Sequence, residues 1–175
     1  MEIRKILFPV DLTGFSSKIV PQVKFMARNF NAEIHLLYVV GSLEKYSTFF
    51  VPHPSLDQME KESVQRAEGK LDEFAKEFFY GFPRITTAVM LGNPVEQIER
   101  YVESAGIDLI IMATHGRHGL ERALFGSIAD EVVRSTFIPV MCINVSIEEE
   151  RWKVPGEVAH SRIVPSEPDQ LGARQ

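Results

Sequence analysis

The sequence has 175 residues but a single cysteine, Cys142, and no surplus of basic residues. One cysteine excludes a disulfide within the chain and any metal site built on paired cysteines. Because Cys142 lies in a strongly apolar run, the sequence predicts a buried structural thiol. The formal net charge is −5, so no overall positive field attracts nucleic acid or anionic lipid, and neither is an expected partner.

Long hydrophobic runs are also missing. No stretch approaches the roughly 18 apolar residues of a membrane-spanning helix, and the apolar stretch near the N-terminus is too short for a secretory signal. We therefore expect no membrane association and a cytoplasmic location. The hydrophobic fraction of 45% and the charged fraction of 25% are ordinary for a globular domain that buries a sizeable core.

The sequence alternates apolar runs with helical patterns. Nearly continuous apolar runs predict strands buried on both faces at residues 3–10, 33–40, 84–91, 108–113 and 139–145. Between them apolar residues recur at helical spacing. Asn93 and Pro94 form a good helix start, Gly106 marks the end of that helix, and a last helix is expected from Ser127. Such alternation predicts a doubly wound parallel α/β sheet with helices on both faces, which binds ligands outside the carboxyl ends of its strands.

Two segments do not fit this alternation. Residues 41–57 form a long connection for a compact domain, with Phe49 and Phe50 among its aromatic residues. Residues 147–175 form a C-terminal tail outside the domain, which we place at 1–146. The tail contains three prolines and several apolar residues, so two readings stay open: docking onto the domain or a partner, and partial disorder.

The candidate ligand-binding motif lies in residues 112–130, MATHGRHGLERALFGSIAD. Gly116 and Gly119 allow tight backbone and close approach to a ligand. Gly126 and Ser127 stand where a helix is expected to begin, and free N–H groups there favour an anion. From the residues alone, a phosphate site and an ordinary glycine-containing loop with a helix cap are equally good readings. No lysine follows Gly126, so this is not a Walker A loop, and no G-x-G-x-x-G is present.

This stretch closely resembles the universal stress protein family. Its nucleotide-binding members carry Gly, two residues, Gly, nine residues, then Gly-Ser or Gly-Thr. Here Gly116, the nine residues 117–125 and Gly126-Ser127 match, whereas Ala113 replaces the first glycine. The resemblance covers about residues 2–146 and includes the motifs Phe8-Pro9-Val10-Asp11, Gly92-Asn93-Pro94 and Pro139-Val140.

The resemblance implies a Rossmann-like, adenine nucleotide alpha hydrolase-like fold with strand order 3-2-1-4-5, and a bound adenine nucleotide. Asp11 would hold the ribose or adenosine end, Val39 and Val40 would form the adenine wall, and the glycine loop would hold phosphates. The positions it assigns to the nucleotide are Pro9, Asp11, Val39, Val40, Met112, Ala113, Thr114, Gly116, Arg117, Gly119, Gly126, Ser127 and Ile128. The ligand would be ATP, or AMP or ADP, with or without Mg or Mn.

Three functions remain open at this stage. The first is a stress-response regulator or interaction module gated by ATP, with little or no hydrolysis, because no general base or Walker lysine is recognisable. The second is a nucleotide-independent interaction module, which Ala113 and the aromatic connection keep open. The third, an ATP-hydrolysing or adenylating enzyme, is disfavoured because residues 9–16 lack the Ser-Gly-Gly-x-Asp-Ser segment of such enzymes.

The histidines show no pattern typical of a catalytic or metal site. His115 and His118 are three residues apart, but no third metal ligand or Ser/His/Asp order is recognisable, so no catalytic or metal role is assigned. His35, His53 and His160 have no pattern around them.

The strand at residues 139–145 would lie at a sheet edge, and both this exposed edge and the family resemblance predict a homodimer paired through it.

Overall fold

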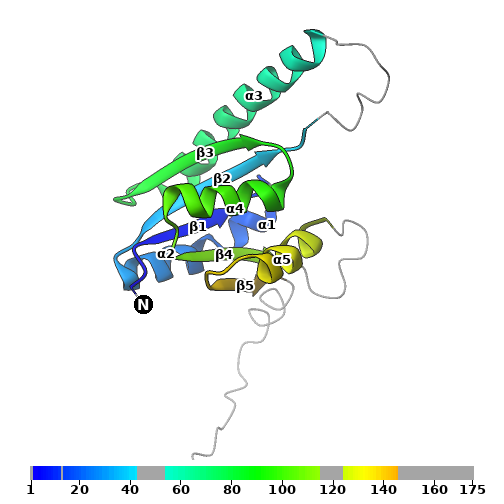
Figure 1. The fold of residues 1–175 in the computed structure, drawn as a ribbon. Coiled ribbons are helices and arrows are strands. Elements are labelled where there is room, and N and C mark those ends of the chain that lie inside the picture. The colour runs from blue at the N-terminus through cyan, green and yellow to red at the C-terminus, as the bar shows by residue number, and fades with distance from the viewer. Residues whose placement is uncertain (1, 13, 43–53, 115–123, 146–175) are drawn as a thin grey trace, which may run out of the picture.

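Five parallel strands in the order β3-β2-β1-β4-β5 form the centre of the molecule in a computed structural model (Figure 1). The structure describes residues 2–12, 14–42, 54–114 and 124–145, and for residues 54–57 and 124–127 it describes the backbone alone. The strands are β1 (Lys5–Pro9), β2 (Glu33–Val40), β3 (Ile85–Leu91), β4 (Leu109–Thr114) and β5 (Val140–Asn144). All adjacent pairs are parallel, so the predicted doubly wound sheet and its strand order are confirmed.

Helices cover both faces of this sheet (Figure 1). They are α1 (Gly14–Lys18), α2 (Val20–Phe30), α3 (Pro54–Phe79), α4 (Pro94–Ala105) and α5 (Leu124–Ser135). The first three share one face and the last two share the other. This division of the helices follows from right-handed crossover connections. The chain first adds β2 and β3 on one side of β1 and then adds β4 and β5 on the other side.

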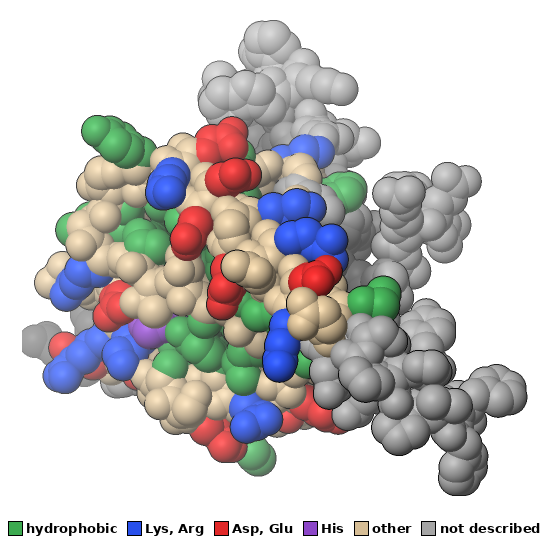
Figure 2. Space-filling view, turned by 90° about the horizontal axis from the view of Figure 1, so that it is seen from above, with side chains coloured by type: hydrophobic (Ala, Val, Ile, Leu, Met, Phe, Trp, Pro, Cys, Tyr) green, Lys and Arg blue, Asp and Glu red, His purple; other side chains and the backbone are tan. Residues whose placement is uncertain are grey.

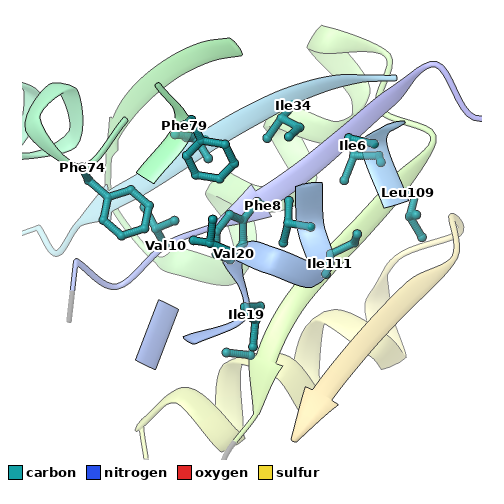
Figure 3. Packing of buried hydrophobic residues seen from close by; sticks show 14 of the residues in the cluster. Ile6, Phe8, Val10, Ile19, Val20, Ile34, Phe74, Phe79, Leu109 and Ile111 are labelled. Atoms are coloured by element: carbon teal, nitrogen blue, oxygen red, sulfur yellow. The ribbon is translucent and has the colours of Figure 1, made fainter. Parts of the chain in front are cut away.

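Two apolar clusters result from the alternation of side chains along each strand. Phe8 and Ile111 point to the α1–α3 face, where they pack with Ile19 and Phe79 in the cluster drawn in Figure 3. Leu7, Ile110 and Met112 point to the other face and pack under α4 and α5. Because both faces are buried, the strands read as continuous apolar runs rather than as alternating ones.

The predicted ends of α4 are confirmed in detail. The Asn93 side chain accepts hydrogen bonds from the backbone N–H groups of Val95 and Glu96. Gly106 ends the helix in the left-handed conformation, with φ 65°. β4 begins three residues after this C-cap, at Leu109.

Several local expectations need correction. α3 begins at Pro54, inside the segment predicted as a connection up to residue 57, and the short helix α1 was not predicted. α5 begins at Leu124 rather than at Ser127. The predictions for the tail and for residues 43–53 lie outside the described residues.

Cys142 was wrongly predicted to be buried; its side chain is exposed on β5. The reason is its position on an edge strand, where one face and one edge lack the cover that the central strands have. The part of the side chain that is buried, together with the Asp130 carboxylate, still raises the pKa of the thiol.

Helices that could cross a membrane are not found within the described ranges.

Candidate functional site

The carboxyl ends of β1 and β4 lie side by side at the centre of the sheet. Leu7 pairs with Ile110, so Pro9 stands level with Met112 two residues further on. From β1 the chain runs outward to β2, whereas β4 leads to β5 on the opposite side. This reversal is the switch point at which doubly wound sheets bind ligands, and Pro9, Asp11 and Thr114 stand around it.

Asp11 is held by Ser16 through two hydrogen bonds. The Asp11 N–H donates to Ser16 Oγ at 2.9 Å, and the Ser16 hydroxyl donates to Asp11 Oδ1 at 2.6 Å. The shorter distance is typical of a hydroxyl bonded to an ionised carboxylate. The sequence analysis did not assign Ser16 a role; the local signal for this pair is a serine five residues after the aspartate.

The backbone next to Asp11 is unusual. Leu12 has φ 55°, a left-handed conformation that leucine seldom adopts. The chain turns sharply there, which lets α1 follow directly and bring Ser16 back to Asp11. Strained residues of this kind are often found at ligand sites.

The last three residues of β4 differ in where their side chains lie. Met112 is fully buried in the α4–α5 cluster, and Ala113, 3% exposed, belongs to the α1–α3 cluster. The methyl group of Ala113 therefore packs into the protein core. Thr114 is half-buried, and its hydroxyl donates to the carbonyl of Ile143 on β5 at 3.5 Å.

The predicted adenine wall lies one strand away, at the end of β2. Val39 and Val40 are both half-buried. Val39 packs against the α4–α5 cluster, and the Val40 carbonyl accepts a hydrogen bond from Gly92 N at 2.9 Å. A carbonyl oxygen has a second lone pair, so this bond leaves Val40 able to meet a base.

Only part of the predicted phosphate loop is described. Gly116, Arg117 and Gly119 lie outside the described residues, as do His115 and His118. Gly126 and Ser127 are the third and fourth residues of α5, and the backbone N–H groups of the first three helical residues have no acceptor within the helix. Ile128 is half-buried against the α4–α5 cluster.

A hollow of about 590 Å³ lies elsewhere, between α3 and the end of β3. It is lined by Glu60, Lys61, Val64, Gln65, Glu68 and Leu91, none of which is a predicted ligand residue. Its two carboxylates do not suit a phosphate group. Acidic and basic side chains are mixed across the described part of the face shown in Figure 2.

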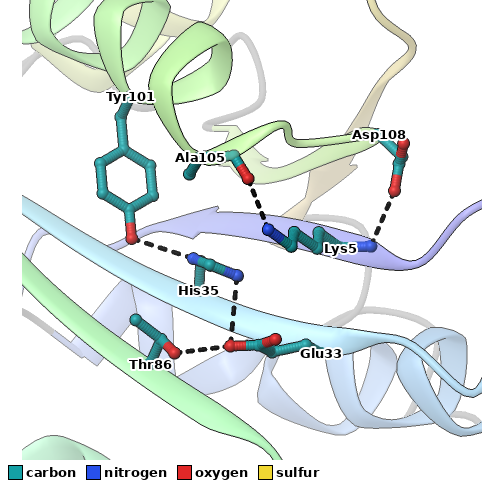
Figure 4. Close-up of polar contacts among 7 residues, drawn as sticks. All are labelled: Lys5, Glu33, His35, Thr86, Tyr101, Ala105 and Asp108. Carbon is teal, nitrogen blue, oxygen red and sulfur yellow. Dashed lines mark hydrogen bonds and ion pairs between the residues drawn. The ribbon is translucent and has the colours of Figure 1, made fainter.

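A polar cluster occupies the opposite, amino-terminal ends of the strands (Figure 4). His35 Nδ1 lies 2.9 Å from the Tyr101 hydroxyl, and His35 Nε2 lies 3.4 Å from Glu33 Oε1. Thr86 donates to the same Glu33 oxygen at 2.6 Å. No local pattern marks His35 in the sequence, because its hydrogen-bond partner Tyr101 comes from α4, 66 residues further along the chain.

Burial lowers the pKa of His35, an effect that the Glu33 carboxylate opposes and Lys5 reinforces. Burial and Glu33 together raise the pKa of Tyr101. The imidazole is thus held neutral and the phenol protonated. A proton on Nε2 would face the Glu33 carboxylate and would leave Nδ1 to accept from the Tyr101 hydroxyl. Within the described ranges, no group of three or more His, Cys, Asp or Glu side chains could hold a metal ion.

Fold and site together define a doubly wound α/β domain with a polar site at its switch point. The model of the universal stress protein family matches residues 2–144. The chain belongs to this family.

Individual relatives agree with the assignment. "Universal stress protein MJ0531" of Methanocaldococcus jannaschii is 31% identical over 146 residues, which cover 80% of this chain and 81% of the relative. "Universal stress protein MJ0577" of the same organism is 28% identical over 153 residues, covering 80% and 94%. The solved structure of MJ0577 superposes with a TM-score of 0.68, 25% identity, and coverage of 82% of this chain and 97% of that one.

Two further solved structures contain adenine nucleotides. One is a universal stress protein in complex with cAMP, with a TM-score of 0.53 and 16% identity over 83% of this chain and 99% of that one. The other is the universal stress protein from Archaeoglobus fulgidus in complex with dAMP, with a TM-score of 0.52 and 15% identity over 82% and 100%. At these identities the likeness shows the fold alone.

Proposed function

We propose that this universal stress protein binds an adenine nucleotide, ATP in the first place, at the carboxyl ends of β1, β2 and β4. The observation that carries the proposal is the oriented Asp11 carboxylate at the switch point, beside the strand that leads to the first turn of α5. A carboxylate there suits ribose hydroxyl donors, and free N–H groups in a helix's first turn suit phosphate.

The end of β2 supplies the apolar surface that a base needs. Val39 and Val40 would border adenine, while Met112, Ala113 and Thr114 would offer backbone. Because the Ala113 side chain is buried in the α1–α3 cluster, replacement of the family glycine is compatible with a ligand on the other side of the backbone. The complexes with cAMP and dAMP support the proposal in so far as the same fold holds adenine nucleotides in those proteins.

Binding, rather than turnover, is the proposed activity. Nucleotide would set the conformation or assembly of a stress-response regulator, with little or no hydrolysis, and a divalent ion such as Mg or Mn would accompany the phosphates. A homodimer paired through β5 is part of this proposal. β5 is the last strand of the described sheet, and Cys142 and the neighbouring Phe137 are exposed.

The test is a titration of nucleotide-stripped protein with ATP, ADP and AMP by calorimetry, with mass spectrometry of any nucleotide released from protein as purified. Asp11→Asn should weaken ATP binding at least about tenfold, because hydrogen bonds to a charged group are among the stronger ones. Asp72→Asn, on an exposed part of α3, is the matched control and should bind as the parent does.

Two outcomes would contradict the proposal. Absence of any binding signal for the three nucleotides, with none co-purified, would favour the nucleotide-independent interaction module. Steady release of phosphate or pyrophosphate from ATP would instead favour an enzyme.

A further inference from the structure

Ser16 is a buried polar residue whose hydroxyl has one evident partner. It is 1% exposed, yet it lies in a five-residue helix, α1, directly after the sharp turn at Leu12. Its hydroxyl accepts from the Asp11 N–H and donates to Asp11 Oδ1. The Ser16 hydroxyl thus forms hydrogen bonds with both the backbone and the carboxylate of Asp11.

This pair of bonds fixes the direction of the Asp11 carboxylate. A free aspartate side chain turns about two torsion angles and loses that freedom when it binds a ligand. The Asp11 carboxylate, whose Oδ1 lies 2.6 Å from the buried Ser16 hydroxyl, has already lost this torsional freedom before a ligand binds. Preorganisation of this kind strengthens binding without adding a contact to the ligand.

The Asp11–Ser16 pair lies close to the carboxyl end of β4. α1 contacts β4, so the Asp11–Ser16 pair stands next to the strand end that continues toward the glycine loop. An ionised carboxylate has about four acceptor positions, and the Ser16 hydroxyl occupies one of them, on Oδ1. Vicinal ribose hydroxyls are donors that such a carboxylate can accept together.

We infer that Ser16 is a positioning residue that sets the Asp11 carboxylate for the 2′- and 3′-hydroxyls of a ribonucleotide and so determines selectivity for ribose over dideoxyribose. This inference rests on the proposed nucleotide site and specifies which part of the ligand that site reads. Ser16 itself does not touch the ligand.

The test compares ATP with 2′,3′-dideoxy-ATP by calorimetry in four proteins. The parent chain should bind ATP about tenfold more tightly than the dideoxy nucleotide, as the loss of hydrogen bonds to a charged acceptor predicts. Ser16→Ala should weaken ATP about five- to tenfold and leave dideoxy-ATP unchanged. Ser16→Cys puts a somewhat larger and only weakly donating thiol in place of the hydroxyl. It should act as Ser16→Ala does and replaces it if the alanine variant folds poorly.

Ser17→Ala is the matched control. Ser17 is the next residue of α1, and its hydroxyl donates to the Gly14 carbonyl at 3.0 Å instead of to Asp11. This variant should keep the parent's preference for ATP. The difference between Ser16 and Ser17 separates the carboxylate contact from a general effect on the short helix.

Other outcomes would overturn the inference. A parent chain that binds both nucleotides equally has no ribose selectivity for Ser16 to set, although the proposed function would stand. Equal weakening of both nucleotides by Ser16→Ala and Ser16→Cys would make Ser16 a structural residue only, and no weakening of either would remove its role. If the parent binds neither nucleotide, the proposed function fails and this inference fails with it.

Discussion

The hydroxyl of Tyr101 and Nδ1 of His35 lie 2.9 Å apart and join α4 to β2 beneath it. The two rings meet edge to face, with centroids 5.8 Å apart. This contact closes the amino-terminal end of the sheet, on the opposite side from the proposed nucleotide site. We therefore expect changes to this contact to alter the stability of the domain and not its nucleotide binding.

Tyr101→Phe should reduce the free energy of unfolding by about 1–3 kcal/mol, because it leaves His35 Nδ1 buried without a donor. Urea unfolding followed by circular dichroism measures the change. Tyr80→Phe removes the same hydroxyl from a residue that is 92% exposed and should change the free energy by less than about 0.5 kcal/mol. Equal effects of both substitutions would contradict a role for the His35–Tyr101 bond.

Stability should depend on pH through His35. Its pKa is lowered in the folded protein, mainly by burial, so the unfolded chain binds the proton more readily. The free energy of unfolding should therefore be highest above the ordinary histidine pKa of about 6.5 and fall as the pH drops from there toward the lowered value.

His35→Gln removes this titration, so its stability profile should be flatter than the parent's between about pH 7 and pH 5. Both proteins keep the nearby charges of Glu33 and Lys5, so the difference between the profiles isolates the imidazole. Parallel profiles would mean that His35 titrates alike in the folded and unfolded chains.

Gly92→Ala should destabilise the domain by more than about 2 kcal/mol. Gly92 has φ 139°, which side-chain-bearing residues seldom adopt, and an added Cβ would lie 2.8 Å from Nε2 of the buried Gln97. Gly69→Ala is the control, because nothing lies within 4 Å of a Cβ there. In the middle of α3 it should raise stability by about 0.5–1 kcal/mol. The same sign for both substitutions in thermal unfolding would refute this account of Gly92.

Asn93→Ala should cost about 1 kcal/mol, since it removes the acceptor for two backbone N–H groups at the start of α4. Asn93→Asp keeps an oxygen acceptor and should restore most of the stability. Chemical denaturation of the three proteins compares these values, and an aspartate variant as unstable as the alanine variant would argue against capping as the cause.

Cys142→Lys should shift the proposed homodimer toward monomer, because two-fold pairing through β5 would bring the like charges of the two copies together. Sedimentation equilibrium at micromolar concentration measures the assembly state. Phe25→Lys places the same charge on α2 at a residue that is 63% exposed and should leave the assembly unchanged. A monomeric parent chain would contradict the proposed dimer itself.

Local sequence signals determined most of the fold. The apolar runs at residues 33–40 and 108–113 correspond to β2 and β4 with bounds that differ by a residue at most. Asn93 and Gly106 marked the two ends of α4 for stereochemical reasons that do not depend on the rest of the chain. The order of elements then permitted only a parallel, doubly wound sheet.

The candidate site was predictable to a smaller extent. Asp11 and Gly126-Ser127 were selected because motifs are local, and their role in binding a nucleotide stays a prediction. Which face each side chain takes was not readable: Ala113 was weighed as a ligand neighbour, and the structure buries its methyl group in the α1–α3 cluster.

The sequence by itself determined the periodicities, the caps and the family motif, because these depend on a residue and its close neighbours along the chain. Tertiary structure alone decided the pairing of Tyr101 with His35 and the exposure of Cys142. Both depend on which elements lie next to one another across the sheet: burial needs a neighbour on every side, and β5 lacks one within the described chain.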